Sequence, residues 1–303
     1  MNKLQKIGNY ILHPLTIKDY ISWKFVRHGL YNYLSDEKYL SCRYSKKMKK
    51  NLNLENPLLF TEKLQWLKIN DRNKLYTKMV DKYEAKEYIE AKVGKKYVVP
   101  TLGLYNSFDE IDFSSLPNDF IMKCTHNSGG AVVCVNRGNL DIKAARKKIN
   151  KCLNHNHYYS GREWPYKNVK PRIIIEKLLS NSDGSEVVEY NFFCFNGVPK
   201  LVMTCHGDKR IKRYNDFYDM DFNKMNLKCE YDNSSIVEKK PKQFEQMVSM
   251  SKKLSENIPH LRVDLYLCDD KIYVGELTFF HWGGFCKFEP EMWDEILGSW
   301  IDL

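Results

Sequence analysis

Two carboxylates lie in neighbouring β-type runs near the end of the chain. Asp264 is in the run 262–267 and Glu276 in the run 272–279, and both have apolar neighbours. The polar pair Asp269-Asp270 between the runs indicates a turn, so the stretch is predicted to form a β-hairpin. Side chains alternate between the two faces of a strand. What the two carboxylates can do therefore depends on whether the hairpin brings them to the same face.

The connection between the two runs decides which residues are paired. A two-residue turn would pair Asp264 with Gly275 and place Glu276 on the opposite face. A loop with an odd number of residues, or a β-bulge, would pair Asp264 with Glu276 and Arg262 with Thr278. We expect the odd loop or a bulge, because two carboxylates and an arginine on one face would form a metal and phosphate site. The alternative is an ordinary amphipathic hairpin with a polar outer face.

A lysine followed by a glycine-containing loop is a second candidate for phosphate contact. Lys123 lies near the end of the predicted strand 120–124, the segment 125–130 follows, and a second strand is expected over 131–135. Glycines allow backbone N–H groups to approach phosphate oxygens, and a lysine neutralises their charge. The sequence contains neither G-x-x-x-x-G-K-[ST] nor G-x-G-x-x-G. A plain β-hairpin with a glycine turn is the alternative.

Glu176 is a lone carboxylate in the β-branched run 172–179. Such a residue could hold a purine amino group or a ribose hydroxyl, or it could lie on the surface. His155 and His157 are two residues apart in a polar segment, a spacing that is weak for a metal pair, so a solvated loop is favoured there.

The bulk composition is that of an ordinary globular protein. Of the 303 residues, 43% are hydrophobic and 28% are charged, which permits a sizeable core in one or two domains. No apolar run approaches the roughly 20 residues of a membrane span, and no signal peptide is visible. The nine cysteines form no C-x-x-C pair. This pattern favours reduced thiols in the cytoplasm over disulfides or zinc.

The net charge of +10 raises the question of nucleic acid binding. We expect no nucleic acid partner, because the basic residues are mostly dispersed and lack an ordered aromatic–basic platform. The two densest clusters, 43–50 and 209–213, could meet an anionic substrate or an acidic membrane surface, although solvated surface charge is commoner. Residues 1–50 mix aromatic and basic side chains. They are expected to pack as helices on the body of the protein, with a peripheral membrane role left open.

The elements that would position these residues begin with helices and continue with β-rich sequence. Helices are expected over 61–67, 75–93, 140–153, 244–254 and 291–300, and strands over 96–100, 189–195 and 198–205, with Asn196-Gly197 as a hairpin turn. No regular βαβ pattern and no internal repeat is present, which indicates an α+β protein with antiparallel sheets.

The order of these features resembles the ATP-grasp superfamily. More closely, it is similar to the TupA-like ATP-grasp family of polysaccharide gene clusters, through four phrases: Asn56-Pro57 with Thr61–Trp66, Asp81-Lys82-Tyr83, Cys194–Gly197, and Arg262–Tyr266 with Gly275–Thr278. The resemblance covers about residue 50 to the end. It implies an ATP-grasp fold, in which two α+β lobes close on ATP, preceded by a helical extension. The expected divisions are a helical extension 1–55, an N-terminal α/β part 56–118, a small lobe with the glycine loop 119–180, and a C-terminal lobe with the metal site 181–303.

The resemblance also implies roles for individual residues. ATP phosphates would be contacted by Lys82, Lys123 and the loop residues Asn127, Ser128, Gly129 and Gly130, and adenine or ribose by the Ile175 backbone, Glu176 and Glu189. Mg²⁺ would be bound by Asp264, Glu276 and Thr278. Arg262, together with Lys123, would stabilise the transferring phosphoryl group. The acceptor would lie beside His281, Gly283 and Gly284, with Lys209 and Arg210 as contacts for an anionic sugar.

Two positions depart from the family pattern. Thr278 stands where many ATP-grasp enzymes have asparagine, and a hydroxyl is a weaker Mg²⁺ ligand than an amide oxygen, which leaves the second metal open. Asn191 follows Tyr190 where the family often has lysine, so one positive contact is missing or has moved, for example to Lys200 or Lys209.

The leading hypothesis is an ATP- and Mg²⁺-dependent carboxylate–amine ligase of capsule, O-antigen or cell-wall polysaccharide synthesis. It would join a sugar carboxylate, on a sugar nucleotide or lipid-linked glycan, to an amino acid or amine. We expect a cytoplasmic protein, with association at the cytoplasmic face of the inner membrane left open. The second hypothesis is a glycosyltransferase that uses a nucleotide sugar, for which Asp219-Met220-Asp221 is the only D-x-D. The third is a non-catalytic glycan- or membrane-binding protein.

Overall fold

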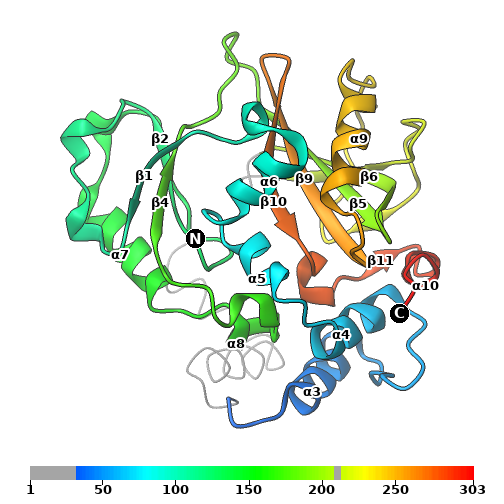
Figure 1. The fold of residues 1–303 in the computed structure, drawn as a ribbon. Helices are drawn as coiled ribbons and strands as arrows, with labels where there is room; N and C mark the ends of the chain where they lie inside the picture. Colours follow the sequence, from blue (N-terminus) through cyan, green and yellow to red (C-terminus); the bar gives the residue numbers. More distant parts are fainter. Residues whose placement is uncertain (1–31, 208–212) are drawn as a thin grey trace, which may run out of the picture.

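The computed structural model describes residues 32–207 and 213–303. The expected extension 1–55 lies outside the described residues up to position 31, and Lys209 and Arg210 lie outside them as well. Two antiparallel sheets form the body of the described chain. Figure 1 shows the smaller sheet at the left of the view and the larger one at the right, with helices α5 (Leu75–Val80) and α6 (Ala85–Val93) between them.

The smaller sheet has the strand order β1-β4-β2-β3. Its strands are β1 (Thr101–Tyr105), β2 (Phe120–Cys124), β3 (Val132–Cys134) and β4 (Ile173–Glu176). Helix α7 (Ile142–Leu153) places Ala145 and Ile149 in a buried core with Phe120 and Ile173. The sequence predicts a domain boundary between residues 118 and 119. Strand β1 lies before this boundary and the other three strands lie after it, so the smaller sheet contains strands of both predicted divisions.

The larger sheet has the order β10-β9-β5-β6-β7. Its strands are β5 (Val188–Phe195), β6 (Val198–His206), β7 (Tyr214–Tyr218), β9 (His260–Cys268) and β10 (Lys271–Thr278). Helix α9 (Phe244–Leu254) packs Met247 and Leu254 into the main core beside β5. The turn between β5 and β6 has positive φ at Asn196 and Gly197, 48° and 78°, which confirms the predicted hairpin turn.

Two predicted elements differ from the structure. The helix expected over 75–93 is interrupted between α5 and α6, because the Asp81 carboxylate accepts backbone N–H groups of Tyr83 and Glu84 and starts a new turn. The strand expected over 96–100 is a 3₁₀ turn, Lys95–Tyr97, followed by a single bridge from Val98 to Val274. Pro100 lacks an N–H for a ladder, and β1 begins at the next residue.

The remaining helices and strands are α3 (Asp36–Met48), α4 (Phe60–Asn70), α8 (Tyr158–Gly161), β8 (Lys228–Cys229), β11 (Phe288–Glu289) and α10 (Met292–Ser299).

Helices α4 and α10, from the two ends of the described chain, meet at the base of the larger sheet. Asp294 of α10 accepts hydrogen bonds from the N–H (2.9 Å) and hydroxyl (2.8 Å) of Thr61 at the start of α4. At Gly298, a Cβ would lie 2.1 Å from the Leu58 carbonyl oxygen, so these two helices approach too closely for a side chain there.

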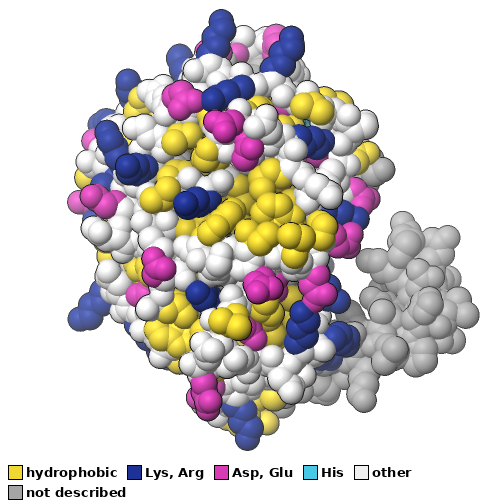
Figure 2. All heavy atoms as spheres, turned by 90° about the vertical axis from the view of Figure 1, so that its right-hand side faces the viewer, with side chains coloured by type: hydrophobic (Ala, Val, Ile, Leu, Met, Phe, Trp, Pro, Cys, Tyr) yellow, Lys and Arg dark blue, Asp and Glu magenta, His cyan; other side chains and the backbone are white. Residues whose placement is uncertain are grey.

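The surface is relevant to the predictions about membrane and nucleic acid partners. None of the helices in the described ranges is both long and apolar enough to cross a membrane. On the face that Figure 2 shows, lysine and arginine side chains are interspersed with aspartate and glutamate rather than gathered in one basic surface. All nine cysteines lie within the described residues, where none is joined in a disulfide.

His260 is expected to make the fold sensitive to acid. Its ring lies among the rings of Phe60, Phe193 and Phe195, with a centroid distance of 5.0 Å to both Phe60 and Phe195, and burial lowers its pKa to about 3. Between pH 6.5 and 3 the unfolded chain therefore binds a proton that the folded chain does not. This group should reduce the free energy of unfolding by about 1.4 kcal/mol per pH unit as the pH falls through that window.

The test is urea unfolding of the wild type and His260→Gln at several pH values between 7.5 and 4.5. Glutamine does not titrate, so the variant should lose stability more slowly on acidification, whatever its stability at pH 7.5. Parallel pH dependences of the two proteins would contradict the assignment.

Candidate active site

A cleft of about 670 Å³ lies between the two sheets. The smaller sheet and the loop after β2 contribute Ile121, Lys123, Ser128 and Gly129 to its lining. The larger sheet contributes residues of β5, β6, β7, β9 and β10, and the segments 157–166 and 280–283 lie beside them. Further lining residues are Arg43, Lys82, Ala131, Arg213 and Tyr231. Polar groups from distant parts of the sequence therefore converge on one space.

The hairpin of β9 and β10 has a two-residue turn. Asp269 and Asp270 both have positive φ, 46° and 60°, and Cys268 pairs directly with Lys271. The predicted odd loop is therefore wrong. Aspartate tolerates the left-handed region because its short side chain can hydrogen-bond locally, so the tight turn forms with no glycine at either position.

A bulge at Gly275 brings the two carboxylates together. A bulge is the second of the two arrangements that we expect from the sequence, and it is confirmed. The register shifts between Val274 and Glu276, and beyond the shift two pairs form: Glu276 with Asp264, and Thr278 with Arg262. A Cβ at Gly275 would lie 2.4 Å from the Tyr266 ring. Glycine is therefore required here, because the ring of the neighbouring strand covers the bulged backbone.

Arg262 is held in one orientation by three side chains. Its Nε and Nη2 donate to the two oxygens of Asp264 at 2.7 and 2.6 Å, and Nη2 also donates to the Thr278 hydroxyl at 3.3 Å. Its Nη1 donates to Nδ1 of His281 at 2.6 Å. Burial raises the pKa of the Asp264 carboxyl to about 7, and the bidentate guanidinium opposes this shift.

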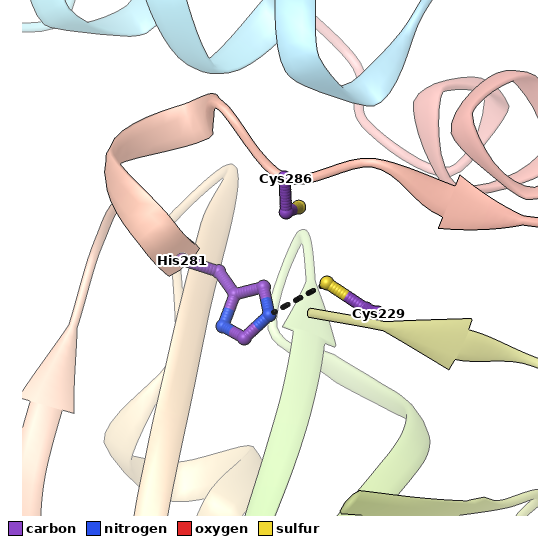
Figure 3. Close-up of side chains that lie close together, drawn as sticks. All are labelled: Cys229, His281 and Cys286. Atoms are coloured by element: carbon purple, nitrogen blue, oxygen red, sulfur yellow. Dashed lines mark hydrogen bonds between the residues drawn. The ribbon is translucent and has the colours of Figure 1, made fainter. Parts of the chain in front are cut away.

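Beneath Arg262, a group of metal-type ligands lies in the core. Ligand atoms of Cys229, His281 and Cys286 all lie within 4.8 Å of one another (Figure 3). Arginine is only a donor, so Nδ1 of His281 accepts and its Nε2 carries the proton, which faces Cys229 Sγ at 3.8 Å. Burial raises the pKa of the Cys286 thiol well above its usual range. His281 thus connects Cys229 to Arg262 and holds the guanidinium from below.

Lys82 connects the hairpin of β9 and β10 to the glycine loop. It comes from the break between α5 and α6, and its Nζ donates to the Asn127 carbonyl at 2.9 Å and lies 3.5 Å from Glu276 Oε1. Burial opposes ionisation of Glu276, but Lys82 and Arg262 outweigh it and lower the pKa of this carboxyl. Glu276 is therefore ionised and faces the cleft.

Glu176 is a buried residue with two lysine partners. Its carboxylate forms ion pairs with Lys86 and, at 3.0 Å, with Lys123. The surface location that the sequence left open is therefore wrong. Ile175 is fully buried in a strand flanked by β1 and β2, and in the described chain neither it nor Glu176 lines the main cleft. Their contact with adenine remains a prediction.

Asn191 joins two carboxylates at the floor of the cleft. With its amide nitrogen toward them, it donates to Asp264 Oδ1 at 2.9 Å and to Glu189 Oε1 at 3.3 Å. Nη2 of Arg213 lies 3.3 Å from Glu189 Oε2 and supplies a positive charge at this place. Lys200, one of the two positions to which the missing family lysine was expected to have moved, is exposed on β6 and does not line the cleft.

The glycine segment after β10 is fixed from below by α4. Gln65 Nε2 donates to the Gly284 carbonyl at 2.7 Å, and Lys68 Nζ donates to the Gly283 carbonyl at 2.6 Å. Burial lowers the pKa of Lys68 to about 7. Gly283 lines the cleft, whereas His281 lies beneath it as the partner of Arg262. The family phrase around Thr61–Trp66 thus has a structural role at this end of the site.

The glycine loop borders two spaces. Ser128 and Gly129 line the main cleft, while Asn127 and Gly130 line only a neighbouring cavity of about 400 Å³. The Asn127 amide donates to the carbonyls of Cys152 and His155 and ties the loop to the end of α7.

Several residues of the site are absent from the sequence prediction. These are Lys86, Glu163 and Tyr266, whereas the sequence places Arg213 in the basic cluster 209–213, His157 in a weak histidine pair and Trp282 in the segment 281–284 beside the acceptor. Lys86 follows Lys82 by four residues, a spacing that could have suggested a shared face. Glu163 carries no such signal, because only the path of segment 157–166 brings it to the cleft.

Two antiparallel sheets that enclose a cleft lined by lysines, a glycine loop and paired carboxylates define the ATP-grasp class. The TupA-like ATPgrasp family model matches residues 62–302, so the chain belongs to the TupA-like ATP-grasp family. No curated protein matches the chain.

Solved structures of ATP-grasp ligases are similar at low identity. The ligase PsnB with a phosphomimetic precursor, Mg and ADP has 12% identity and a TM-score of 0.41, over 78% of this chain and 62% of that one. D-alanine–D-alanine ligase from Bacillus anthracis with ATP has 13% identity and a TM-score of 0.39, over 66% and 53%. D-cycloserine synthetase DcsG has 13% identity and a TM-score of 0.39, over 68% and 63%. This chain covers less than two thirds of the length of each of these three structures.

Proposed function

We propose that this protein is an ATP- and Mg²⁺-dependent carboxylate–amine ligase. It would phosphorylate a carboxylate and join it to an amine, with a sugar carboxylate such as a uronic acid as the acceptor and an amino acid or amine as the partner. The setting would be capsule, O-antigen or cell-wall polysaccharide synthesis. The carrying observation is that the bulge at Gly275 pairs Asp264 with Glu276 in a cleft shared with Lys82 and Lys123.

The donor set fits magnesium. Asp264 and Glu276 offer hard carboxylate oxygens, the ligands that Mg²⁺ prefers, and both line the cleft. When bound, Mg²⁺ would neutralise charge on the ATP phosphates. Thr278 also lines the cleft, and its hydroxyl accepts from Arg262, as both oxygens of Asp264 do, so its part as a third ligand stays a prediction. Lys82, Lys123 and the loop residues Ser128 and Gly129 would contact the phosphates.

Arg262 would stabilise negative charge on the transferring group. Its side chain is fixed before any substrate binds, so no reorganisation is needed at the moment of reaction. Asp264, Thr278 and His281 supply this fixation.

The test of the proposed function compares nucleotides and then substrates. ATP with Mg²⁺ should raise the melting temperature, and UDP-sugars should not; ADP should then be released with members of a panel of hexuronates and amino acids. The glycosyltransferase alternative has no support from the D-x-D segment, because Asp219 accepts the N–H groups of Asp221 and Asn223 in its own turn. Stabilisation by UDP-sugars and not by ATP would overturn the ligase assignment. Stabilisation by neither nucleotide would favour the non-catalytic reading.

His281 offers a graded test of the support for Arg262. Asparagine places an acceptor near the position of Nδ1, whereas glutamine places one near Nε2. We expect His281→Asn to retain most of the ATP-dependent ADP release, and His281→Gln to lower kcat at least tenfold with little change in the KM for ATP. Melting temperatures of both variants serve as the control for loss of the buried ring, and equal kcat values would contradict a positioning role.

A further inference from the structure

Glu163 differs from the other carboxylates of the cleft. Asp264 faces Arg262, Glu276 faces Lys82, and Glu189 faces an arginine as well. Among the residues that the structure describes, the carboxylate of Glu163 has one ion-pair partner, Nε2 of His157 at 3.5 Å. A histidine carries a full charge only when it is protonated.

The Glu163 carboxylate is enclosed but opens into the cleft. The residue is 8% exposed and lines the cleft with His157. Its Oε1 would lie 2.9 Å from a Cβ at Gly161 and 3.4 Å from one at Gly283, so two glycines leave the space that it occupies. Burial opposes its ionisation, but His157, Lys68 and Arg43, which lines the same cleft, outweigh burial and hold the pKa of this carboxyl below its usual range. Glu163 is therefore negatively charged at neutral pH.

The buried cation that acts on this carboxylate, Lys68, makes its hydrogen bonds elsewhere. Lys68 donates to three oxygens, those of Gln65, Gly161 and Gly283, at 3.0, 2.9 and 2.6 Å. An ammonium has three N–H donors, so none remains for Glu163. The lysine thus fixes the two glycines behind the carboxylate and leaves the cleft side of Glu163 to a ligand.

The surroundings of Glu163 suit a small organic cation. Phe280, Trp282 and Tyr166 line the same cleft, and aromatic faces attract ammonium groups. Gly283, which the carboxylate approaches, is two residues from His281, the partner of Arg262. The negative pocket and the arginine thus lie on adjoining parts of one cleft wall.

We propose that Glu163, supported by His157, binds the ammonium group of the amine substrate beside the reacting centre. This inference rests on the proposed ligase function and names the place at which the amine enters. Of the cations whose field stabilises this carboxylate, only His157 is paired with it directly in the described residues, so a cationic substrate would find an anionic partner there.

Amide formation makes one bond and breaks one. R–NH₃⁺ held by Glu163 loses one proton to solvent, which leaves a neutral amine with a free electron pair. That pair forms the C–N bond to the acyl carbon, and the C–O bond to the phosphoryl group breaks. Inorganic phosphate leaves with the electron pair of that bond and takes the second proton from nitrogen.

The experiment uses the full chain with ATP, Mg²⁺ and a panel of hexuronic acids, free and UDP-linked, and two kinds of nucleophile. Hydroxylamine is neutral at pH 7, so it needs no cation site, and its product is a hydroxamate that ferric chloride colours. Amino acids and simple amines form the second arm. Glu163→Gln should keep hydroxamate formation within about twofold, and should lower amine-dependent product formation at least tenfold with a raised KM for the amine. Glu163→Asp should be intermediate.

Glu238→Gln is the matched control. Glu238 also pairs with a histidine, His206, but it does not line the cleft, so both arms should stay at the wild-type rate. Equal loss in both arms for Glu163→Gln, or no loss in either, would overturn the amine site while leaving the ligase function intact. No hydroxamate from the wild type with any carboxylate would overturn the ligase function, and the amine site with it.

Discussion

Glu276→Gln is expected to lower ATP-dependent ADP release by about 100- to 1,000-fold, the range for loss of one preorganised electrostatic contact. The substitution keeps the shape of the side chain and removes its charge. It leaves Lys82, 3.5 Å away, without its anionic partner, and removes one of the two carboxylates that fit magnesium. The measurement is steady-state ADP release at saturating ATP with the hexuronate and amino acid panel.

The control for Glu276→Gln is Glu87→Gln. Glu87 also pairs with a lysine, Lys78 at 2.8 Å, but on the exposed surface, where such pairs contribute little. Its activity should equal that of the wild type. Magnesium-dependent thermal stabilisation by ATP should be lost in Glu276→Gln and kept in Glu87→Gln. Full activity of Glu276→Gln, or full wild-type activity in excess EDTA, would remove the paired carboxylates from the proposed function.

Arg262→Lys is expected to lower kcat by about 100-fold although the positive charge is retained. A lysine cannot reproduce the planar fork that donates to both oxygens of Asp264 and to His281. The charge would therefore be present but not fixed where the phosphoryl group is transferred. Rates at saturating ATP, with melting temperatures of the same preparations, give the result.

Two further variants separate catalysis from folding at this position. Arg262→Met leaves Asp264 as a buried charge without its partner and should destabilise the fold by about 3–5 kcal/mol, whereas Arg262→Lys should cost less. Arg72→Lys, in an exposed pair with Asp36 at 2.8 Å, should change neither activity nor stability. Wild-type kcat in a folded Arg262→Lys protein would show that the geometry of the guanidinium is not needed.

The fold and much of the site could be predicted because their signals are local. The alternating pattern of the hairpin and the Asn196-Gly197 turn depend on neighbouring residues. The family phrases add long-range order to these signals, and the match over residues 62–302 confirms that order. The interruption after Val80 was not predicted, because apolar periodicity continues through Asp81 while a side-chain hydrogen bond breaks the helix.

The sequence by itself determined that Asp264, Glu276 and Arg262 lie in paired strands and that the chain belongs with ATP-grasp proteins. Only the tertiary structure decided the rest. The face on which Glu276 lies depends on a bulge at Gly275, where the Tyr266 ring of the neighbouring strand occupies the place of a side chain. Glu163 lies at the cleft through the path of segment 157–166, and Lys68, 95 positions earlier in the chain, hydrogen-bonds to the carbonyls of Gly161 and Gly283 beside it. Contacts of this kind depend on distance in space, and a sequence pattern records only distance along the chain.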